Sequence, residues 1–102
     1  MARFQVWAPL ATRVELAIGT ARHPMTAAER GWWWADAPGA DYAFSLDGGA
    51  PFPDPRSLWQ PSGVHGPSRL VDHGAFRWTD QSWQAPPLAS GVVYELHVGT
   101  FT

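Results

Sequence analysis

The amino-acid sequence predicts an all-β fold, a sandwich of about seven short strands, and three observations lead to this prediction. In several short stretches apolar residues recur at every second position, which is the period of a strand with one buried face. Prolines and glycines, ten of each among 102 residues, separate these stretches as turn residues do. No stretch shows the spacing of apolar residues that marks an amphipathic helix.

The first strands are expected at residues 3–8 and 13–18, which read "RFQVWA" and "RVELAI". Both alternate apolar with polar or outward-facing residues, as half-buried strands do. Pro9 belongs to the short connection between them. The stretch "HPMT" (residues 23–26) is a weaker candidate, and we expect an edge strand there because Pro24 has no backbone N–H to donate.

The next strand candidate, "GWWWAD", carries three consecutive tryptophans. Successive side chains of a strand point to opposite faces, so Trp32 and Trp34 share one face and Trp33 takes the other. The turn residues "PG" at 38–39 lead into the strand "DYAFSL", in which the tyrosine, the phenylalanine and the leucine share one face. Its end is marked by "DGG", which has the composition of a hairpin turn.

A proline- and glycine-rich passage from about residue 50 to residue 67 is expected to be an ordered loop. Loops of this length in a compact domain are usually functional or disordered. The four large apolar residues of this loop argue against disorder. The stretch "SRLVD" after it is a short strand candidate.

The final segment, "GVVYELHVGTFT", differs from the other strands. It is almost continuously apolar or β-favouring over residues 92–98, which suits a strand buried on both faces of a parallel sheet. Pro86 and Pro87 form a stiff spacer before it. We therefore expect the last strand to belong to a different structural unit from the sandwich.

Composition excludes several classes of function. The formal net charge is −2, and all seven basic residues are scattered arginines, so neither a nucleic-acid partner nor a basic binding stripe is expected. No apolar run is long enough to span a membrane. The beginning of the chain lacks the pattern of a signal peptide, and we expect a cytoplasmic protein.

A search for catalytic or metal-binding motifs finds none. The absence of cysteine excludes disulfides and thiolate metal ligands. The four histidines are far apart and match no metal-ligand spacing; they are His23, His65, His73 and His97. We expect no catalytic residue, no metal and no cofactor in this chain.

The seven tryptophans allow two interpretations. A tryptophan can fill a core, with its indole N–H as the one polar group. It can also offer a flat apolar platform to a sugar ring. Because three consecutive strand residues cannot all face one core, the candidates for sugar stacking are Trp32, Trp33 and Trp34.

Four stretches, in order, resemble the N-terminal region of maltooligosyltrehalose trehalohydrolases, which are glycoside hydrolases of the α-amylase superfamily. They are "FQVWAP", "GWWWADAPGADYAFSLDG", "PDPRSLWQPSGVHGPS" and "VYELHVGTFT". The resemblance implies an immunoglobulin-like early-set domain over residues 1–85, a linker over 86–91, and the first strand of a truncated (β/α)₈ barrel over 92–102. The catalytic aspartate and glutamate of this family lie on later barrel strands, so this chain would have neither.

The resemblance also implies roles for the segments. The long loop would dock on the enzyme's own barrel through Asp54, Arg56, Trp59, Val64 and His65. The alternative is that this loop covers its own sandwich core. The complete enzyme would release trehalose from maltooligosyl-trehalose, and the domain would support the barrel and help to shape the substrate cleft.

Two other functions stay open at this point. The chain could be an autonomous α-glucan-binding module, with α-glucan or maltooligosyl-trehalose as its ligand. It could also be the N-terminal domain of a glycogen branching or debranching enzyme, because "FQVWAP" and "YELHVG" recur in those enzymes. In either case, an apolar final strand without neighbours would favour self-association through residues 92–101.

Overall fold

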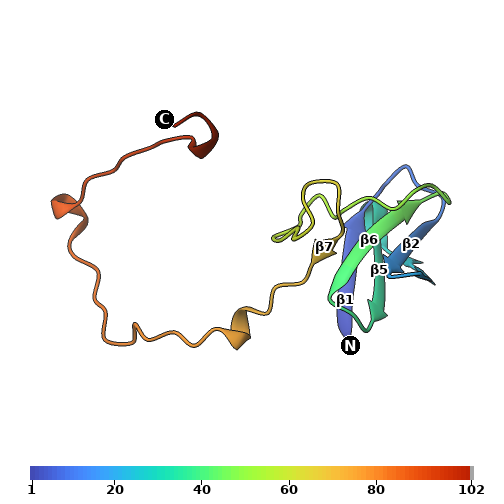
Figure 1. The fold of residues 1–102 in the computed structure, drawn as a ribbon, viewed down its shortest axis with the longest axis horizontal. Helices are drawn as coiled ribbons and strands as arrows, with labels where there is room; N and C mark the ends of the chain where they lie inside the picture. Colours follow the sequence, from blue (N-terminus) through green and yellow to red (C-terminus); the bar gives the residue numbers. More distant parts are fainter. Residues whose placement is uncertain (102) are drawn as a thin grey trace.

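The computed structural model describes residues 1–101 and shows two antiparallel sheets that face each other (Figure 1). The strands are β1 (Ala2–Trp7), β2 (Val14–Ile18), β3 (Ala21–Pro24), β4 (Thr26–Ala27), β5 (Trp32–Ala37), β6 (Asp41–Leu46) and β7 (Ser68–Arg69). One sheet has the order β1-β5-β4 and the other has the order β3-β2-β6-β7. The predicted all-β sandwich is therefore confirmed.

The core lies between the two sheets and follows the alternation of the strands. Leu16 and Val14 on β2 have no exposed surface, and Phe4 on β1 is 3% exposed. The rings of Phe4 and Tyr42 lie 4.8 Å apart between centroids, which joins the inner faces of β1 and β6. This tilted arrangement is one that aromatic pairs prefer.

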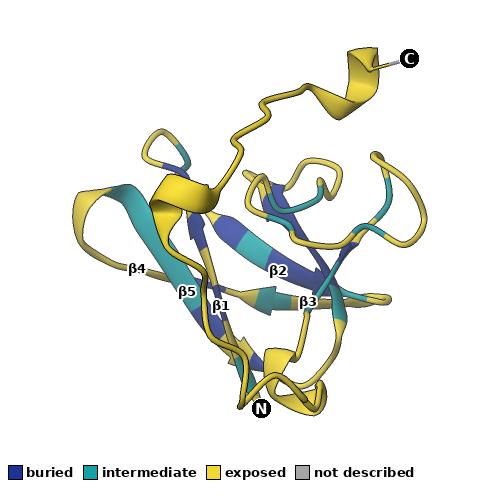
Figure 2. Cartoon of the chain, turned by 90° about the vertical axis from the view of Figure 1, so that its left-hand side faces the viewer, coloured by how far each residue is buried: buried dark blue, intermediate teal, exposed yellow. Residues whose placement is uncertain are grey.

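Strand β6 is buried on both faces, which the alternating pattern did not predict. Ala43 and Ser45 point away from the core, yet they are as buried as the core residues Tyr42 and Phe44. Figure 2 shows the buried residues on the strands and the exposed residues mainly on the loops and on the segment that leads to the C-terminus. Leu46 follows Tyr42 and Phe44 in the alternation but lies at the end of the strand, where it is 43% exposed.

Two backbone positions hold the turns between the sheets. Gly31 has φ +82°, and a Cβ atom there would lie 2.6 Å from Cβ of Pro9, so only glycine fits this close approach. Asp47 also has a positive φ, and its Oδ1 accepts hydrogen bonds from the backbone N–H groups of Thr12 and Arg13, both at 2.8 Å. These contacts connect the β1–β2 turn to the end of β6.

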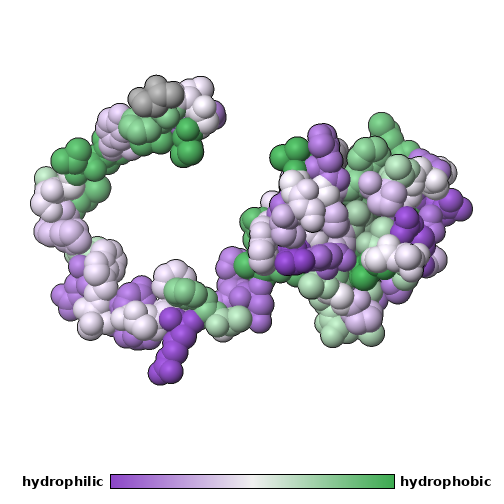
Figure 3. Space-filling model, in the orientation of Figure 1, coloured by the Kyte–Doolittle hydropathy of each residue, from purple (hydrophilic) through white to green (hydrophobic). Residues whose placement is uncertain are grey.

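After Leu70 the chain leaves the sandwich as an extended segment, which we call the C-terminal arm (residues 71–101). Every residue of the arm is exposed. Its only regular elements are three short 3₁₀ turns: η2 (His73–Ala75), η3 (Leu88–Ser90) and η4 (Val98–Thr100). The further 3₁₀ turn of the chain, η1 (Glu29–Gly31), precedes β5. In Figure 3 apolar side chains gather at the far end of the arm, away from the sandwich.

The predicted final strand does not form within this chain. Residues 92–97 pair with no strand, and Val92 and Val93 are 94% and 87% exposed. A strand forms where a neighbouring strand pairs with its backbone groups, and the described residues supply no such neighbour. The expectation for residues 92–102 in a complete barrel therefore stays a prediction, as do the boundaries at residues 85 and 91.

Candidate functional site

The first half of the long loop closes the open edge of the sandwich. Phe52 exchanges two backbone hydrogen bonds of 2.8 Å with Phe44 on β6. Phe52 and Pro53 then line a hollow of about 130 Å³ together with Val6 and Phe44, which come from opposite sheets. This segment therefore covers the domain's own core, as one of the two interpretations of the loop expected.

Asp54 anchors the loop to the sandwich. Its Oδ2 accepts a hydrogen bond of 2.8 Å from the Tyr42 hydroxyl, and its Oδ1 accepts one of 2.8 Å from the backbone N–H of Arg56. Its own backbone N–H donates to Oγ of Ser68, which has no exposed surface. Burial, together with the Asp54 carboxylate, raises the pKa of Tyr42, so its hydroxyl remains a donor well above neutral pH.

The second half of the loop presents apolar side chains to solvent. Leu58 and Val64 are 75% and 74% exposed, and Trp59 is about half exposed. Trp59 is held in place, because its carbonyl accepts from the backbone N–H of Arg69 and the Arg69 guanidinium lies 5.0 Å from its ring. The side chains of Leu58 and Val64 therefore project into solvent from a loop that is held to the sandwich at Trp59.

The predicted docking residues therefore divide into two groups. Asp54, Arg56 and Trp59 make contacts within their own domain, whereas Val64 and His65 are exposed. The sequence could not separate the two groups, because the partners of Asp54 and Arg56 lie on strands elsewhere in the chain. Docking on the barrel stays a prediction for all five residues.

The three consecutive tryptophans alternate as the sequence predicted. Trp33 turns toward the core, and its indole N–H donates to the Ala8 carbonyl at 3.1 Å. Trp32 and Trp34 lie on the outer face of the β1-β5-β4 sheet, directly opposite Trp7 and Gln5 of β1. Trp33 is thus the candidate least accessible to a sugar.

Trp7 was missed as a candidate, although the sequence contained the signal. The alternation of "RFQVWA" already placed it on the face opposite Phe4 and Val6, and it is 58% exposed. Its indole N–H donates to the Arg30 carbonyl at 2.9 Å, which fixes the ring. We refer to the outward residues of β1 and β5 as the outer tryptophan face; they are Arg3, Gln5, Trp7, Trp32, Trp34 and Asp36.

Arginines cover part of this face. The Arg3 guanidinium lies 4.5 Å from the Trp34 ring and also donates two hydrogen bonds, of 2.9 and 2.8 Å, to Asp36. The hydrogen bonds from Arg3 lower the pKa of Asp36. Arg56 reaches across from the long loop and lies 5.5 Å from the Trp32 ring. Trp7 is the tryptophan of this face without such a cover.

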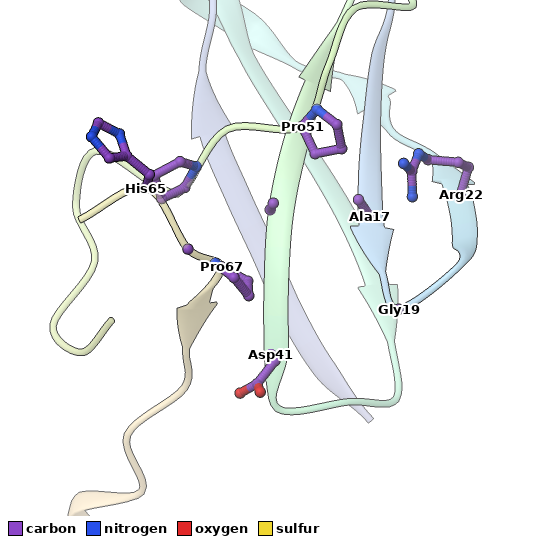
Figure 4. Close-up of a pocket in the computed structure, with 10 residues that line it drawn as sticks. Ala17, Gly19, Arg22, Asp41, Pro51, His65 and Pro67 are labelled. Carbon is purple, nitrogen blue, oxygen red and sulfur yellow. The ribbon is translucent and has the colours of Figure 1, made fainter. Parts of the chain in front are cut away.

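A hollow of about 400 Å³ lies on the outer side of the other sheet (Figure 4). Its floor includes Ala17 and Ala43, which face each other across β2 and β6 and leave space because their side chains are small. Pro51, His65 and Arg22 contribute to its walls. Prolines and short side chains line much of this hollow, and its titratable groups are Arg22, Asp41 and His65.

The four aspartates of the sandwich are engaged in structural contacts. Asp36 and Asp41 each receive two hydrogen bonds from an arginine, and Asp41 has its pKa lowered by the hydrogen bonds from Arg69. Asp47 and Asp54 hold the turns described above. Hydrolysis of a glycosidic bond needs two carboxyl groups that flank it. Each aspartate of residues 1–70 is instead held by hydrogen bonds within the sandwich.

Metal and membrane sites were also considered for residues 1–101. No group of three histidine, aspartate or glutamate side chains comes together in this part of the chain to hold a metal ion. None of the helical turns described there has the length and apolarity needed to cross a membrane.

Comparison with known proteins gives a consistent result, although no family model matches the chain. The malto-oligosyltrehalose trehalohydrolase of Arthrobacter ramosus is 47% identical over 98% of this chain, and that of Rhizobium sp. (strain M-11) is 50% identical over the same share. The enzyme of the same name from Deinococcus radiodurans is 44% identical. This chain spans 17–19% of the length of these relatives.

Solved structures agree with these matches. A crystal structure from Salmonella typhimurium that carries the name alpha amylase superposes with a TM-score of 0.82 and 38% identity, over 98% of this chain and 18% of its own. Pullulanase from Bacillus acidopullulyticus shares the fold, with a TM-score of 0.57 and 23% identity over 69% of this chain and 10% of its own. The resemblance predicted from the motifs is therefore confirmed: over nearly its whole length, this chain is homologous to one segment of the malto-oligosyltrehalose trehalohydrolases.

Proposed function

We propose that the chain is the non-catalytic β-sandwich part of a trehalose-releasing α-glucan hydrolase. One observation carries the proposal: the relatives match 98% of this chain, yet the chain amounts to only about 19% of their length. The engaged aspartates agree with it, because their contacts stabilise turns and strands. The hydrolysis of malto-oligosyltrehalose would then depend on the part of the enzyme outside these residues.

The role of the sandwich in this proposal is to support the catalytic barrel. Leu58, Trp59 and Val64 form an ordered apolar projection, and tryptophan is enriched in the centres of protein interfaces. We propose that the catalytic barrel packs against this projection. The arm would lead across to the barrel, with residues 86–91 as linker and residues 92–102 as the first barrel strand. A cytoplasmic location belongs to the same proposal, and the lack of cysteine fits a reducing compartment.

The proposal predicts that the chain alone releases no trehalose from malto-oligosyltrehalose. The reason is that hydrolysis needs two carboxyl groups that flank the bond, whereas the four aspartates of the sandwich are held in structural hydrogen bonds. Trehalose would be measured after incubation with purified chain, with the full-length Arthrobacter ramosus enzyme as positive control. Turnover that survives purification and disappears on substitution of a single carboxylate in this chain would contradict the proposal.

A further inference from the structure

We propose that the hollow on the outer side of the β3-β2-β6-β7 sheet binds a carboxylate with an apolar body, and that Arg22 holds the carboxylate group. The hollow has a volume of about 400 Å³, which lies within the range of about 300–1,000 Å³ that small-ligand sites occupy. This inference does not depend on the proposed function, because it is argued only from the residues that form the hollow and from their charges.

The floor of the hollow is apolar and is formed by directly paired strands. Ala17 on β2 lies opposite both Ala43 on β6 and Arg22 on β3, so these three residues form one row across the sheet. Both alanines are buried, and residues of the long loop line the same hollow. A Cβ atom added at Gly19 would meet nothing within 4 Å, so there is open space at this end of the hollow.

The loop wall of the hollow is stiff. Its prolines, whose rings fix the backbone angle φ, are Pro51, Pro53 and Pro67. Two contacts hold the loop to the sandwich: the backbone pairing of Phe52 with Phe44, and the hydrogen bond from the Asp54 N–H to Oγ of Ser68. Because the wall is already ordered, little conformational entropy is lost when a ligand binds.

Arg22 is the group that can hold a carboxylate. Its exposed guanidinium donates to the Ala21 carbonyl at 3.3 Å, and no carboxylate of residues 1–101 lies within salt-bridge distance of it. Figure 4 shows the Arg22 side chain directed toward Ala17, with His65 on the other side of the hollow. A guanidinium group can donate two parallel hydrogen bonds to one carboxylate, which fixes the orientation of the ligand.

The acidic groups near the hollow do not compensate this charge. Asp41, which lines the hollow, already receives two hydrogen bonds from Arg69. Glu15, which lies on the same face of β2 as the floor, is 3.8 Å from Arg13. Arg22 is therefore a positive charge without a partner at the edge of an apolar hollow, and this combination favours an anion with an apolar body.

A carboxylate of this kind has two sources. One is a free small molecule. The other is a second copy of this chain, in which Glu95 lies between Tyr94 and Leu96 on the exposed arm. Because Arg22 is exposed, its ion pair with the ligand is screened by water and salt, and we expect a dissociation constant on the order of 1 mM.

The test is a titration of the 102-residue chain with phenylbutyrate, followed by the NMR signals of the Ala17 and Ala43 backbone amides. We expect saturable shifts of both signals. Arg22→Gln should raise the dissociation constant about threefold or more, and Arg22→Lys should restore part of the affinity. Arg77→Gln is the matched control, because Arg77 is an exposed arginine on the arm; it should leave the dissociation constant unchanged. Phenylbutanol, which has the same apolar body without the charge, should bind more weakly than phenylbutyrate.

Light scattering of the same variants separates the two sources. If Glu95 of a second copy occupies the hollow, Glu95→Gln and Arg22→Gln should lower self-association equally, and phenylbutyrate should compete with it. If the ligand is a free small molecule, both variants should self-associate like the original chain while phenylbutyrate still binds at Arg22. The inference is overturned if no saturable shift occurs, if Arg22→Gln leaves the dissociation constant unchanged, or if phenylbutanol binds as tightly as phenylbutyrate. Because Arg22 is exposed, Arg22→Gln should keep the thermal unfolding of the original chain, so a loss of binding would not reflect misfolding.

Discussion

Replacing Leu16 by alanine is expected to destabilise the sandwich by about 2–5 kcal/mol. Leu16 has no exposed surface and lies at the centre of the core between the two sheets. The truncation removes apolar contacts and leaves a cavity that a two-sheet core can only partly close. Because small domains unfold at a free energy of roughly 5–15 kcal/mol, this substitution removes a large share of the total.

The measurement is thermal unfolding by circular dichroism. A loss of about 3 kcal/mol corresponds to a melting temperature lower by roughly 12–24 °C for a domain of this size. Leu10→Ala is the matched control, because Leu10 is 96% exposed and should change stability by less than about 0.5 kcal/mol. Equal effects of the two substitutions would show that the core does not lie between the sheets.

The second large effect is expected from Asp54→Ala. This substitution leaves the partly buried Tyr42 hydroxyl without its acceptor and frees the backbone N–H of Arg56. Loss of a charged acceptor costs about 1.5–3 kcal/mol, and a donor left unpaired adds to this cost. We expect a destabilisation of about 2–4 kcal/mol and faster hydrogen exchange at the amides of residues 52–57.

Two further variants test whether Asp54 stabilises the whole domain through Tyr42 or only a local turn. Asp72→Ala removes a similar local acceptor, which binds the backbone N–H of Gly74 in the arm, and should not alter global stability. Tyr42→Phe combined with Asp54→Ala should lower the free energy of unfolding by less than the sum of the two single substitutions. The reason is that both substitutions remove the same hydrogen bond, between Tyr42 and Asp54. Additive effects in denaturant unfolding would show that Asp54 does not hold the loop through Tyr42.

Strands with one buried face, such as β1, could be predicted from the sequence. In β1 and β2 that burial imposes the alternation by which Phe4, Val6, Val14 and Leu16 are recognised. The opposite faces of Trp32 and Trp33 follow from the same rule. The exposure of Leu46 could not be predicted, because the end of the core depends on how the facing sheet is placed.

The candidate site was less accessible to prediction. The long loop could be recognised from its prolines and glycines, but its division into an anchored and a projecting half depends on Tyr42 and Ser68. Tyr42 lies on β6 and Ser68 on β7, and the fold brings both into contact with Asp54. For Trp7, the alternation of the strand was enough to place the side chain on the outer face. Its hydrogen-bond partner, the Arg30 carbonyl, could be identified only from the structure.

We propose that the sandwich is a self-contained unit and that the arm belongs structurally to the part of the enzyme outside the sandwich. Val92 and Tyr94 are 94% and 73% exposed, and an apolar segment without paired backbone groups favours association between molecules. We therefore expect the intact chain to associate through residues 92–101.

The direct test is to end the chain after Ser90 and to compare thermal unfolding and light scattering with those of the intact chain. The account predicts the same cooperative transition at the same temperature and a molecule that is more monomeric. Loss of the cooperative transition would contradict it, because residues 91–102 would then belong to the sandwich's own sheets.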